Sequence, residues 1–114
     1  GYNIDGVQPD DQRRCGSFSW PPCTSGSYPW ENLQGVIVQA IILHNRGYDV
    51  FNWEDQAIRR AVDWLYNEAK WPATGDDPWI VFAIDYYYGT KYHEGISSST
   101  PGKIAGWTDW SHIP

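Results

Sequence analysis

The stretch from residue 30 to residue 46 is the most restrictive feature of this sequence, because it predicts a helix that is apolar nearly all round. One face has the i, i+3, i+4 spacing of a helix, and the opposite side is apolar too. The first face comprises Leu33, Val36, Ile37, Ala40 and Ile41, and the second comprises Val38, Ile42 and Leu43. Such a helix requires neighbours on both sides, so this segment is expected to lie between other elements.

Two further helices are predicted, over residues 53–69 and 79–88, and the fold class is therefore all-α. The earlier of the two has an amphipathic pattern with a single buried stripe. Residues 79–88 are ambiguous, because their β-branched and aromatic content also suits a strand. Pro78 suits the first turn of a helix and Gly89 suits its end, so we predict a helix here.

The 114 residues form a single region with three parts. Residues 1–29 are rich in Gly, Pro, Ser and Asp and predict loop structure. Residues 30–88 are helical, and residues 89–114 form a loop-rich tail. A loop as long as the first part is more often functional than not, so we look for the site there.

The composition excludes several classes of partner and cofactor. The net charge of −6 argues against nucleic acid, which requires a basic face. No apolar run reaches membrane length, and no glycine motif for a nucleotide appears, so we predict no membrane partner and no cofactor. Eight Trp, eight Tyr and three Phe are unusually many, and such rings either fill a core or stack on sugars.

Cys15 and Cys23 are the only cysteines, and they favour a disulfide that closes a short, proline-containing loop. They do not form a CxxC motif and have no second pair with which to bind zinc. A disulfide would imply an oxidising compartment; the alternative is two free thiols in a reducing one. His93 and His112 lack a third matched ligand, so no metal site is predicted.

The candidate site lies in the same segment, where Asp10 and Asp11 precede Arg13 and Arg14, and Tyr28 precedes the first long helix. Guanidinium groups held by carboxylates can bind an anion, and a tyrosine near cations loses its proton more easily. A carboxylate clamp with a phenolic acid/base suits β-elimination of a uronic acid sugar. The alternative is a solvated ion-pair patch beside a packing tyrosine.

Five segments together resemble the C-terminal part of the alginate lyase superfamily: PDDQRR, SYPWENLQG, GYDVFNWED, DYYYGTKY and PGKIAGWTDWSH. The resemblance spans residues 6–112. It implies a fragment of an (α/α) toroid that cleaves uronic acid polymers such as alginate or glucuronan, without a cofactor. Such an enzyme would be secreted or periplasmic.

The resemblance also implies roles for particular residues. Pro9, Asp11 and Arg14 match the order that leads to the family's arginine, which neutralises the uronate carboxylate. Tyr28 matches the tyrosine that acts as catalytic acid and often also as base. Arg14 and Tyr28 are further apart in sequence than in simpler members, so Tyr2, Tyr48 and the tyrosines at 86–88 remain alternatives for the catalytic tyrosine.

Arg13, Trp20 and Trp30 are the expected substrate-binding residues, the two tryptophans as platforms for sugar rings. The family's catalytic Asn and His are not identifiable here. The pair at residues 44–45, His followed by Asn, ends a core helix and is more typical of packing or capping.

The missing catalytic Asn and His, together with a first helix that two or three helices cannot cover, predict that the chain is the C-terminal portion of a longer lyase, or one piece of a multi-chain assembly. We expect the isolated chain to expose a large apolar patch and to be inactive. The rival functions are a non-catalytic module that binds acidic glycans and a structural subunit of a larger lyase.

Overall fold

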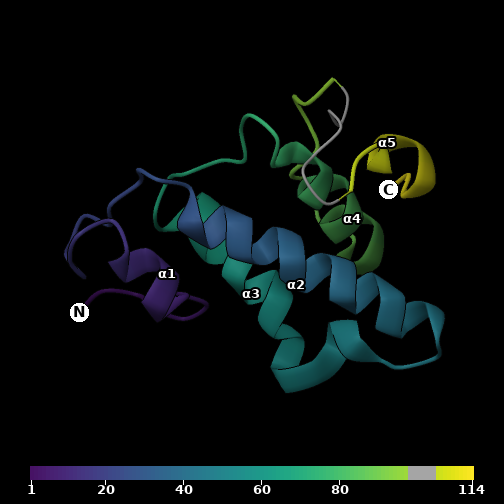
Figure 1. Cartoon of the computed structure of the whole chain (residues 1–114), viewed down its shortest axis with the longest axis horizontal. Helices are drawn as coiled ribbons and strands as arrows, with labels where there is room; N and C mark the ends of the chain where they lie inside the picture. Colours follow the sequence, from purple (N-terminus) through teal and green to yellow (C-terminus); the bar gives the residue numbers. More distant parts are fainter. Residues whose placement is uncertain (98–104) are drawn as a thin grey trace.

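The protein is all-α in the computed structural model, which describes residues 1–97 and 105–114 (Figure 1). The helices are α1 (Pro9–Arg13), α2 (Tyr28–Asn45), the 3-10 turn η1 (Val50–Asn52), α3 (Trp53–Asn67), α4 (Pro78–Tyr88) and α5 (Thr108–Ser111). The described residues contain no strand. The predicted helices over 30–46, 53–69 and 79–88 are thus confirmed as α2, α3 and α4.

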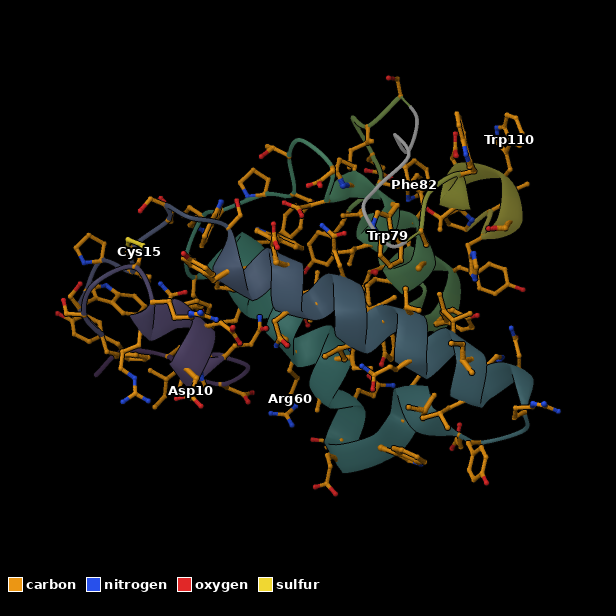
Figure 2. The ribbon with its side chains drawn as sticks, in the orientation of Figure 1. Asp10, Cys15, Arg60, Trp79, Phe82 and Trp110 are labelled. Atoms are coloured by element: carbon orange, nitrogen blue, oxygen red, sulfur yellow. A yellow bond between two sulfur atoms is a disulfide. The ribbon has the colours of Figure 1, made fainter. Side chains whose placement is uncertain are left out.

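Helix α4 is the centre of the packing. All seven residues from Trp79 to Asp85 are buried; α2 and α5 lie beside this helix (Figure 1), and side chains of α3 share its apolar cluster. Gln34 links α2 to the N-terminal end of α4, because it donates to Asp77 Oδ1 at 2.8 Å and accepts from Trp79 Nε1 at 3.3 Å. Figure 2 shows Trp79 in the interior and Trp110, on α5, pointing away from it.

Helix α2 is covered more completely than its sequence predicted. Among its apolar side chains from Trp30 to Leu43, only Ile42 is exposed. Helix α4 and the η1–α3 segment both pack against α2 and join it in shared apolar clusters. The expectation that this chain leaves α2 uncovered is therefore wrong.

Helix α3 begins with a left-handed turn at Glu54, Asp55 and Gln56, whose φ angles are 50°, 54° and 55°. This conformation costs about 1–2 kcal/mol per residue for L-amino acids. Arg60 stabilises the turn, because its guanidinium donates to the Glu54 carbonyl at 2.8 Å and to the Asp55 carbonyl at 3.0 Å.

The N-terminal segment packs along α3. Trp64 Nε1 donates to the Asn3 carbonyl at 2.8 Å, and Arg60 forms an ion pair with Asp5. Gly6 has a φ of +92°, and a Cβ there would lie only 2.1 Å from the Arg60 carbonyl oxygen. Glycine is thus the residue that allows this close approach.

The prediction of an entirely irregular residue 1–29 segment is wrong at α1. Pro9 occupies its first position, and Asp10 and Asp11 lie in its first turn, where carboxylates favour a helix N-terminus. Arg14 caps the C-terminal end of this turn. The candidate arginines are therefore displayed by a helical turn.

Candidate functional site

The structure brings Arg14 and Tyr28 together. The guanidinium carbon of Arg14 lies 4.7 Å from the centroid of the Tyr28 ring, within the range of a cation–π interaction. Both side chains are exposed. Arg14 ends α1 and Tyr28 begins α2, so two helix termini place a cation over a phenol at the surface.

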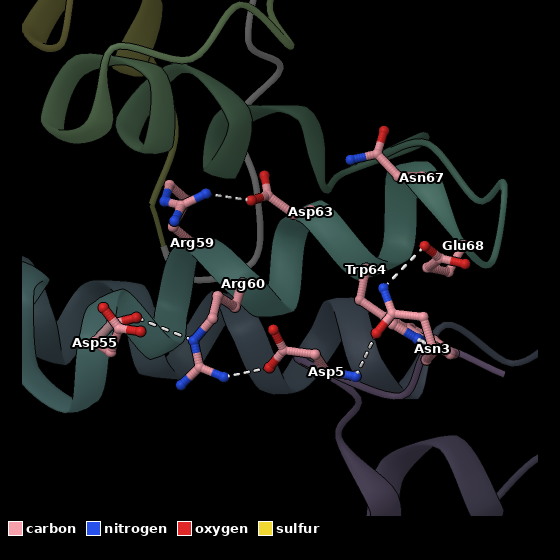
Figure 3. A pocket seen from close by; sticks show the side chains of 9 residues that line it. All are labelled: Asn3, Asp5, Asp55, Arg59, Arg60, Asp63, Trp64, Asn67 and Glu68. Carbon is pink, nitrogen blue, oxygen red and sulfur yellow. Dashed lines mark hydrogen bonds and ion pairs between the residues drawn. The ribbon is translucent and has the colours of Figure 1, made fainter. Parts of the chain in front are cut away.

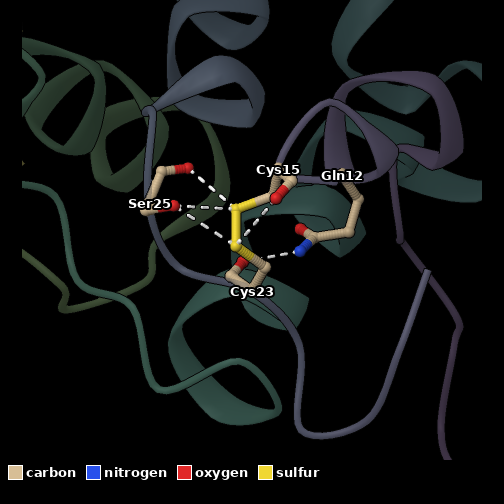
Figure 4. The surroundings of a disulfide bond; sticks show 4 residues. All are labelled: Gln12, Cys15, Cys23 and Ser25. Carbon is tan, nitrogen blue, oxygen red and sulfur yellow. Dashed lines mark hydrogen bonds between the residues drawn. A yellow bond between two sulfur atoms is a disulfide. The ribbon is translucent and has the colours of Figure 1, made fainter. Parts of the chain in front are cut away.

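A disulfide between Cys15 and Cys23 fastens the loop that joins these helices, as predicted (Figure 4). Their Cα atoms are 6.0 Å apart. Gln12, buried on α1, donates to the Cys23 carbonyl at 2.6 Å. Cys23 is thus tied covalently to Cys15, just after α1, and by a partly buried hydrogen bond to α1 itself.

The backbone before Tyr28 is shaped around its ring. Gly26 has a φ of +81°, and a Cβ on it would lie 2.9 Å from Cε2 of Tyr28. Ser27 follows in the left-handed region with a φ of 55°. A larger residue at position 26 would push the ring away, so this glycine helps to set the position of Tyr28 beside Arg14.

Arg13 is held differently from Arg14. It forms an ion pair with Asp10 at 2.7 Å, and both side chains are largely exposed. Exposed pairs of this kind contribute little to stability, so a stronger anionic ligand can compete for Arg13. The expectation that carboxylates hold both arginines is right for Arg13, whereas Arg14 lies against the Tyr28 ring.

Trp30 is not a sugar platform in this fold. Its side chain is 1% exposed, and it packs edge-on against Tyr66 with ring centroids 5.9 Å apart. A buried ring has no face for a ligand, so the assignment of Trp30 to substrate binding is corrected to a core role. Trp20 is half-buried and stacks on Tyr2, with centroids 4.4 Å apart and planes 12° apart.

The histidine candidate on α2 lies far from Tyr28. At about 1.5 Å of rise per residue, His44 is roughly 24 Å along the helix from Tyr28. It packs instead against Phe51 and Tyr87, with ring centroids 5.7 and 4.8 Å away. His44 is therefore a packing residue at the opposite end of α2, as the alternative interpretation held.

His112 belongs to the same aromatic cluster. Its Nε2 lies 3.1 Å from the Tyr87 hydroxyl. Burial lowers the pKa of His112, and the electrostatic influence of the nearby His44 lowers it further. Burial also raises the pKa of Tyr87. This cluster therefore favours neutral side chains and joins the segment after α5 to α4.

Asp85 and His93 form a pair that the sequence analysis did not identify. Asp85 is 1% exposed and accepts hydrogen bonds from the Tyr92 N–H at 3.1 Å, the His93 N–H at 2.6 Å and His93 Nδ1 at 2.6 Å. It also accepts from the Thr90 hydroxyl. The available signal was a single carboxylate in an otherwise apolar helix, which must find partners when buried.

The Asp85–His93 pair orients an imidazole, because the carboxylate accepts from Nδ1 and leaves Nε2 as the basic nitrogen. His93 lines an open hollow of about 250 Å³ together with Lys91 and Glu94. Within residues 1–97 and 105–114, no hydroxyl or thiol hydrogen-bonds to this ring. Its observed role is to fasten the loop after α4.

One groove lies between the N-terminal segment and α3 (Figure 3). It has a volume of about 370 Å³, and its lining is mostly polar. Arg59 is paired with Asp63 at 2.5 Å, Arg60 with Asp5, and Asn3 donates to Glu68 at 3.0 Å. Because these groups satisfy one another, the groove acts mainly as the junction between two segments.

In the part of the chain that the structure describes, no three His, Cys, Asp or Glu side chains are grouped as metal ligands. No described helix combines the length and apolar character needed to cross a membrane.

Comparisons with protein-family models, with curated proteins and with solved structures found no match. The resemblance to the alginate lyase superfamily therefore stays a prediction.

Proposed function

We propose that this chain binds a uronic-acid-containing polysaccharide and takes part in its cleavage by β-elimination. The observation that carries this proposal is the placement of the Arg14 guanidinium over the Tyr28 ring, 4.7 Å from its centroid. The reaction needs a cation for the substrate carboxylate and a proton-transfer group beside it. An exposed arginine against an exposed tyrosine supplies both in one place.

Arg14 would bind the carboxylate of the sugar to be cleaved. A guanidinium that lies over a ring keeps its in-plane N–H groups available for a bidentate pair with a carboxylate. Charge develops on that carboxylate when the C5 proton leaves. Charge-assisted hydrogen bonds therefore strengthen towards the transition state, which is how such a clamp lowers the barrier. Arg13, in its exposed pair with Asp10, would hold a second carboxylate of the polymer.

Tyr28 would carry the proton transfer. The C5–H bond and the bond from C4 to the glycosidic oxygen break, a C4=C5 double bond forms, and the leaving oxygen takes up a proton. A phenol donates that proton, and its phenolate form removes the C5 proton of the substrate. Tyr28 thus serves as the acid and, in its ionised form, as the base.

The wider setting of the site is part of the same proposal. The two long helices α2 and α3, which are joined through η1, suit one hairpin of an (α/α) toroid whose other hairpins come from a further part of the protein or from another chain. The disulfide of Cys15 and Cys23 supports an oxidising compartment, which suits a secreted or periplasmic enzyme.

Binding by the 114-residue chain tests the arginine. Oligosaccharides of alginate and of glucuronan are titrated into wild type, Arg14→Ala and Arg46→Ala by calorimetry. Arg46 is a matched control, because it is exposed and ends α2 at the opposite end from Tyr28. We expect Arg14→Ala to weaken binding at least tenfold, which corresponds to about 1.4 kcal/mol. Equal affinities for Arg14→Ala and wild type would contradict the role of Arg14.

Turnover tests the tyrosine, and it separates a lyase from the rival binding module. Cleavage produces a UV-absorbing unsaturated uronate, which is measured for the chain alone and for the assembly that completes the toroid. We expect Tyr28→Phe to lower kcat while binding is retained, and Tyr48→Phe, another exposed tyrosine, to leave it unchanged. Uronan binding without any unsaturated product in either form would establish the non-catalytic module instead.

A further inference from the structure

We propose that a hollow lined by Tyr2, Ile4, Phe18 and Trp20 is a subsite for one pyranose ring of the bound polysaccharide. The inference rests on the proposed function for the identity of the polymer. It assigns Ile4 and Phe18, which the sequence did not link to any ligand, and it gives Tyr2, an alternative for the catalytic tyrosine, a binding role instead. The hollow has a volume of about 190 Å³.

Two of the three aromatic rings that line this hollow are exposed to solvent. Tyr2 is 66% exposed and Phe18 is 48% exposed. Trp20 and Tyr2 stack almost in parallel, with centroids 4.4 Å apart. Trp20 also packs against the apolar core and so supports the stack, while Tyr2 and Phe18 offer exposed ring surfaces of the kind that the C–H face of a sugar ring contacts.

The size of the hollow selects a small ligand. Pockets for drug-sized molecules begin at about 300 Å³, and this hollow is smaller. Its wall has three aromatic side chains, one aliphatic side chain and Ser19, with a phenolic hydroxyl on Tyr2. A single sugar ring combines an apolar C–H face with hydroxyl groups at its edge, and so it matches such a wall.

Tyr2 is held in place although it is the second residue. Its neighbour Asn3 accepts from Trp64 Nε1 at 2.8 Å and donates to Glu68 at 3.0 Å. Asp5 is paired with Arg60, and Gly6 lies against the Arg60 carbonyl. These contacts fix the N-terminal segment on α3, so the position of Tyr2 is pre-organised before a ligand arrives.

Phe18 and Trp20 come from the loop that the disulfide closes between Cys15 and Cys23. Arg14 directly precedes this loop, so the carboxylate clamp and the aromatic wall are displayed by one continuous, cross-linked segment. Phe18 and Trp20 are the aromatic residues that follow Arg14 in the chain before Tyr28. This continuity favours a ring of the same polysaccharide over an unrelated apolar ligand or a protein partner.

Two probes separate this subsite from the arginine clamp. One is a uronan oligosaccharide, and the other is the same oligosaccharide with its carboxylates reduced to alcohols. Saturation-transfer NMR and calorimetry are applied to wild type, Arg14→Ala, Trp20→Ala, Phe18→Ala and Trp53→Ala. Trp53 is the matched control, because it is 49% exposed and pairs with Tyr48 edge-on rather than in a stack.

We expect Trp20→Ala to weaken the binding of both probes about 3- to 10-fold, as one aromatic stacking contact implies. Phe18→Ala should act in the same direction, and because its side chain is half-exposed it also guards against a Trp20→Ala variant that fails to fold. Trp53→Ala should change neither affinity. Saturation transfer should reach the ring C–H protons of the sugar in wild type.

Four outcomes are decisive. If Arg14→Ala weakens uronan binding while Trp20→Ala and Phe18→Ala do not, the subsite is wrong and the proposed function stands. If the reduced probe binds through Trp20 but uronan binding is independent of Arg14, the subsite stands and the proposed function fails. Equal losses in Trp20→Ala and Trp53→Ala would overturn the subsite, and binding of neither probe to wild type would overturn both.

Discussion

Gly6→Ala should release the N-terminal segment from α3 without unfolding the helices. The added Cβ would lie 2.1 Å from the Arg60 carbonyl oxygen and 2.5 Å from its carbon. Both are backbone atoms inside a helix, so they cannot move aside as a flexible side chain would. The φ of +92° adds strain for any residue with a side chain.

The loss of stability in Gly6→Ala is set by the cheaper of two responses, in which the N-terminal segment either stays docked on α3 or undocks. Keeping the segment docked would combine overpacking, at about 1–3 kcal/mol, with backbone strain, at about 1–3 kcal/mol. Undocking loses one partly buried hydrogen bond from Trp64 to Asn3, at about 0.5–1.5 kcal/mol. It also loses the Tyr2–Trp20 stack at about 0.5–1.5 kcal/mol and an exposed ion pair at up to about 1 kcal/mol. Undocking is cheaper, so we expect a loss of about 2–3 kcal/mol.

Urea unfolding and amide hydrogen exchange measure this effect. Gly47→Ala is the matched control, because Gly47 has a similar φ of +96° and no heavy atom within 4 Å of its Cβ position. The control should cost about 1–2 kcal/mol from the left-handed conformation alone. Only Gly6→Ala should lower the m-value, since less surface remains to be exposed on unfolding, and only it should lose protection at the Val7 N–H, which donates to Ile4. Identical m-values and protection in the two variants would refute the argument from close approach.

Three further predictions follow from the packing. Asp85→Ala should lower the free energy of unfolding by about 3–5 kcal/mol in urea titrations, because it leaves partly buried donors without their acceptor. A loss under 1 kcal/mol would contradict the role of Asp85 in fastening the loop after α4. Replacing Cys15 and Cys23 by serine should cost at most about 2.5 kcal/mol, since the closed loop is short, and equal stability with and without reductant would show that the bond does not form. The free energy of unfolding should fall as the pH drops below about 6.5, because the pKa of His112 is lowered in the native state and the unfolded chain therefore binds a proton more readily. His112→Gln should flatten the dependence of this free energy on pH, and an unchanged dependence would assign it to other groups.

The long helices were predictable because their signals are local. Apolar periodicity, with Pro and Gly at the boundaries, identified α2, α3 and α4 before any tertiary contact was known. The same periodicity places Trp30 on one face with Leu33 and Ile37, and both of those residues are buried. The assignment of Trp30 to sugar binding thus went against a pattern that predicted its burial.

The features that the sequence missed depend on contacts between distant residues. The close approach of Gly6 to α3 and the left-handed turn before Arg60 have no local periodicity that would reveal them. The Asp85–His93 pair joins a helix to the following loop, and only the presence of one carboxylate among apolar neighbours indicated it. The proximity of Arg14 and Tyr28 was expected from their order, whereas the cation–π geometry was not.

The burial of Asp85 has a consequence for the order of folding. Helix α4 cannot enter the core with this carboxylate unpaired, because an uncompensated buried charge costs several kcal/mol. Its partners come from residues 90–93, beyond the end of the helix. The loop must therefore close in the same step in which the helix is buried, so collapse of the core and ordering of this loop are a single cooperative event.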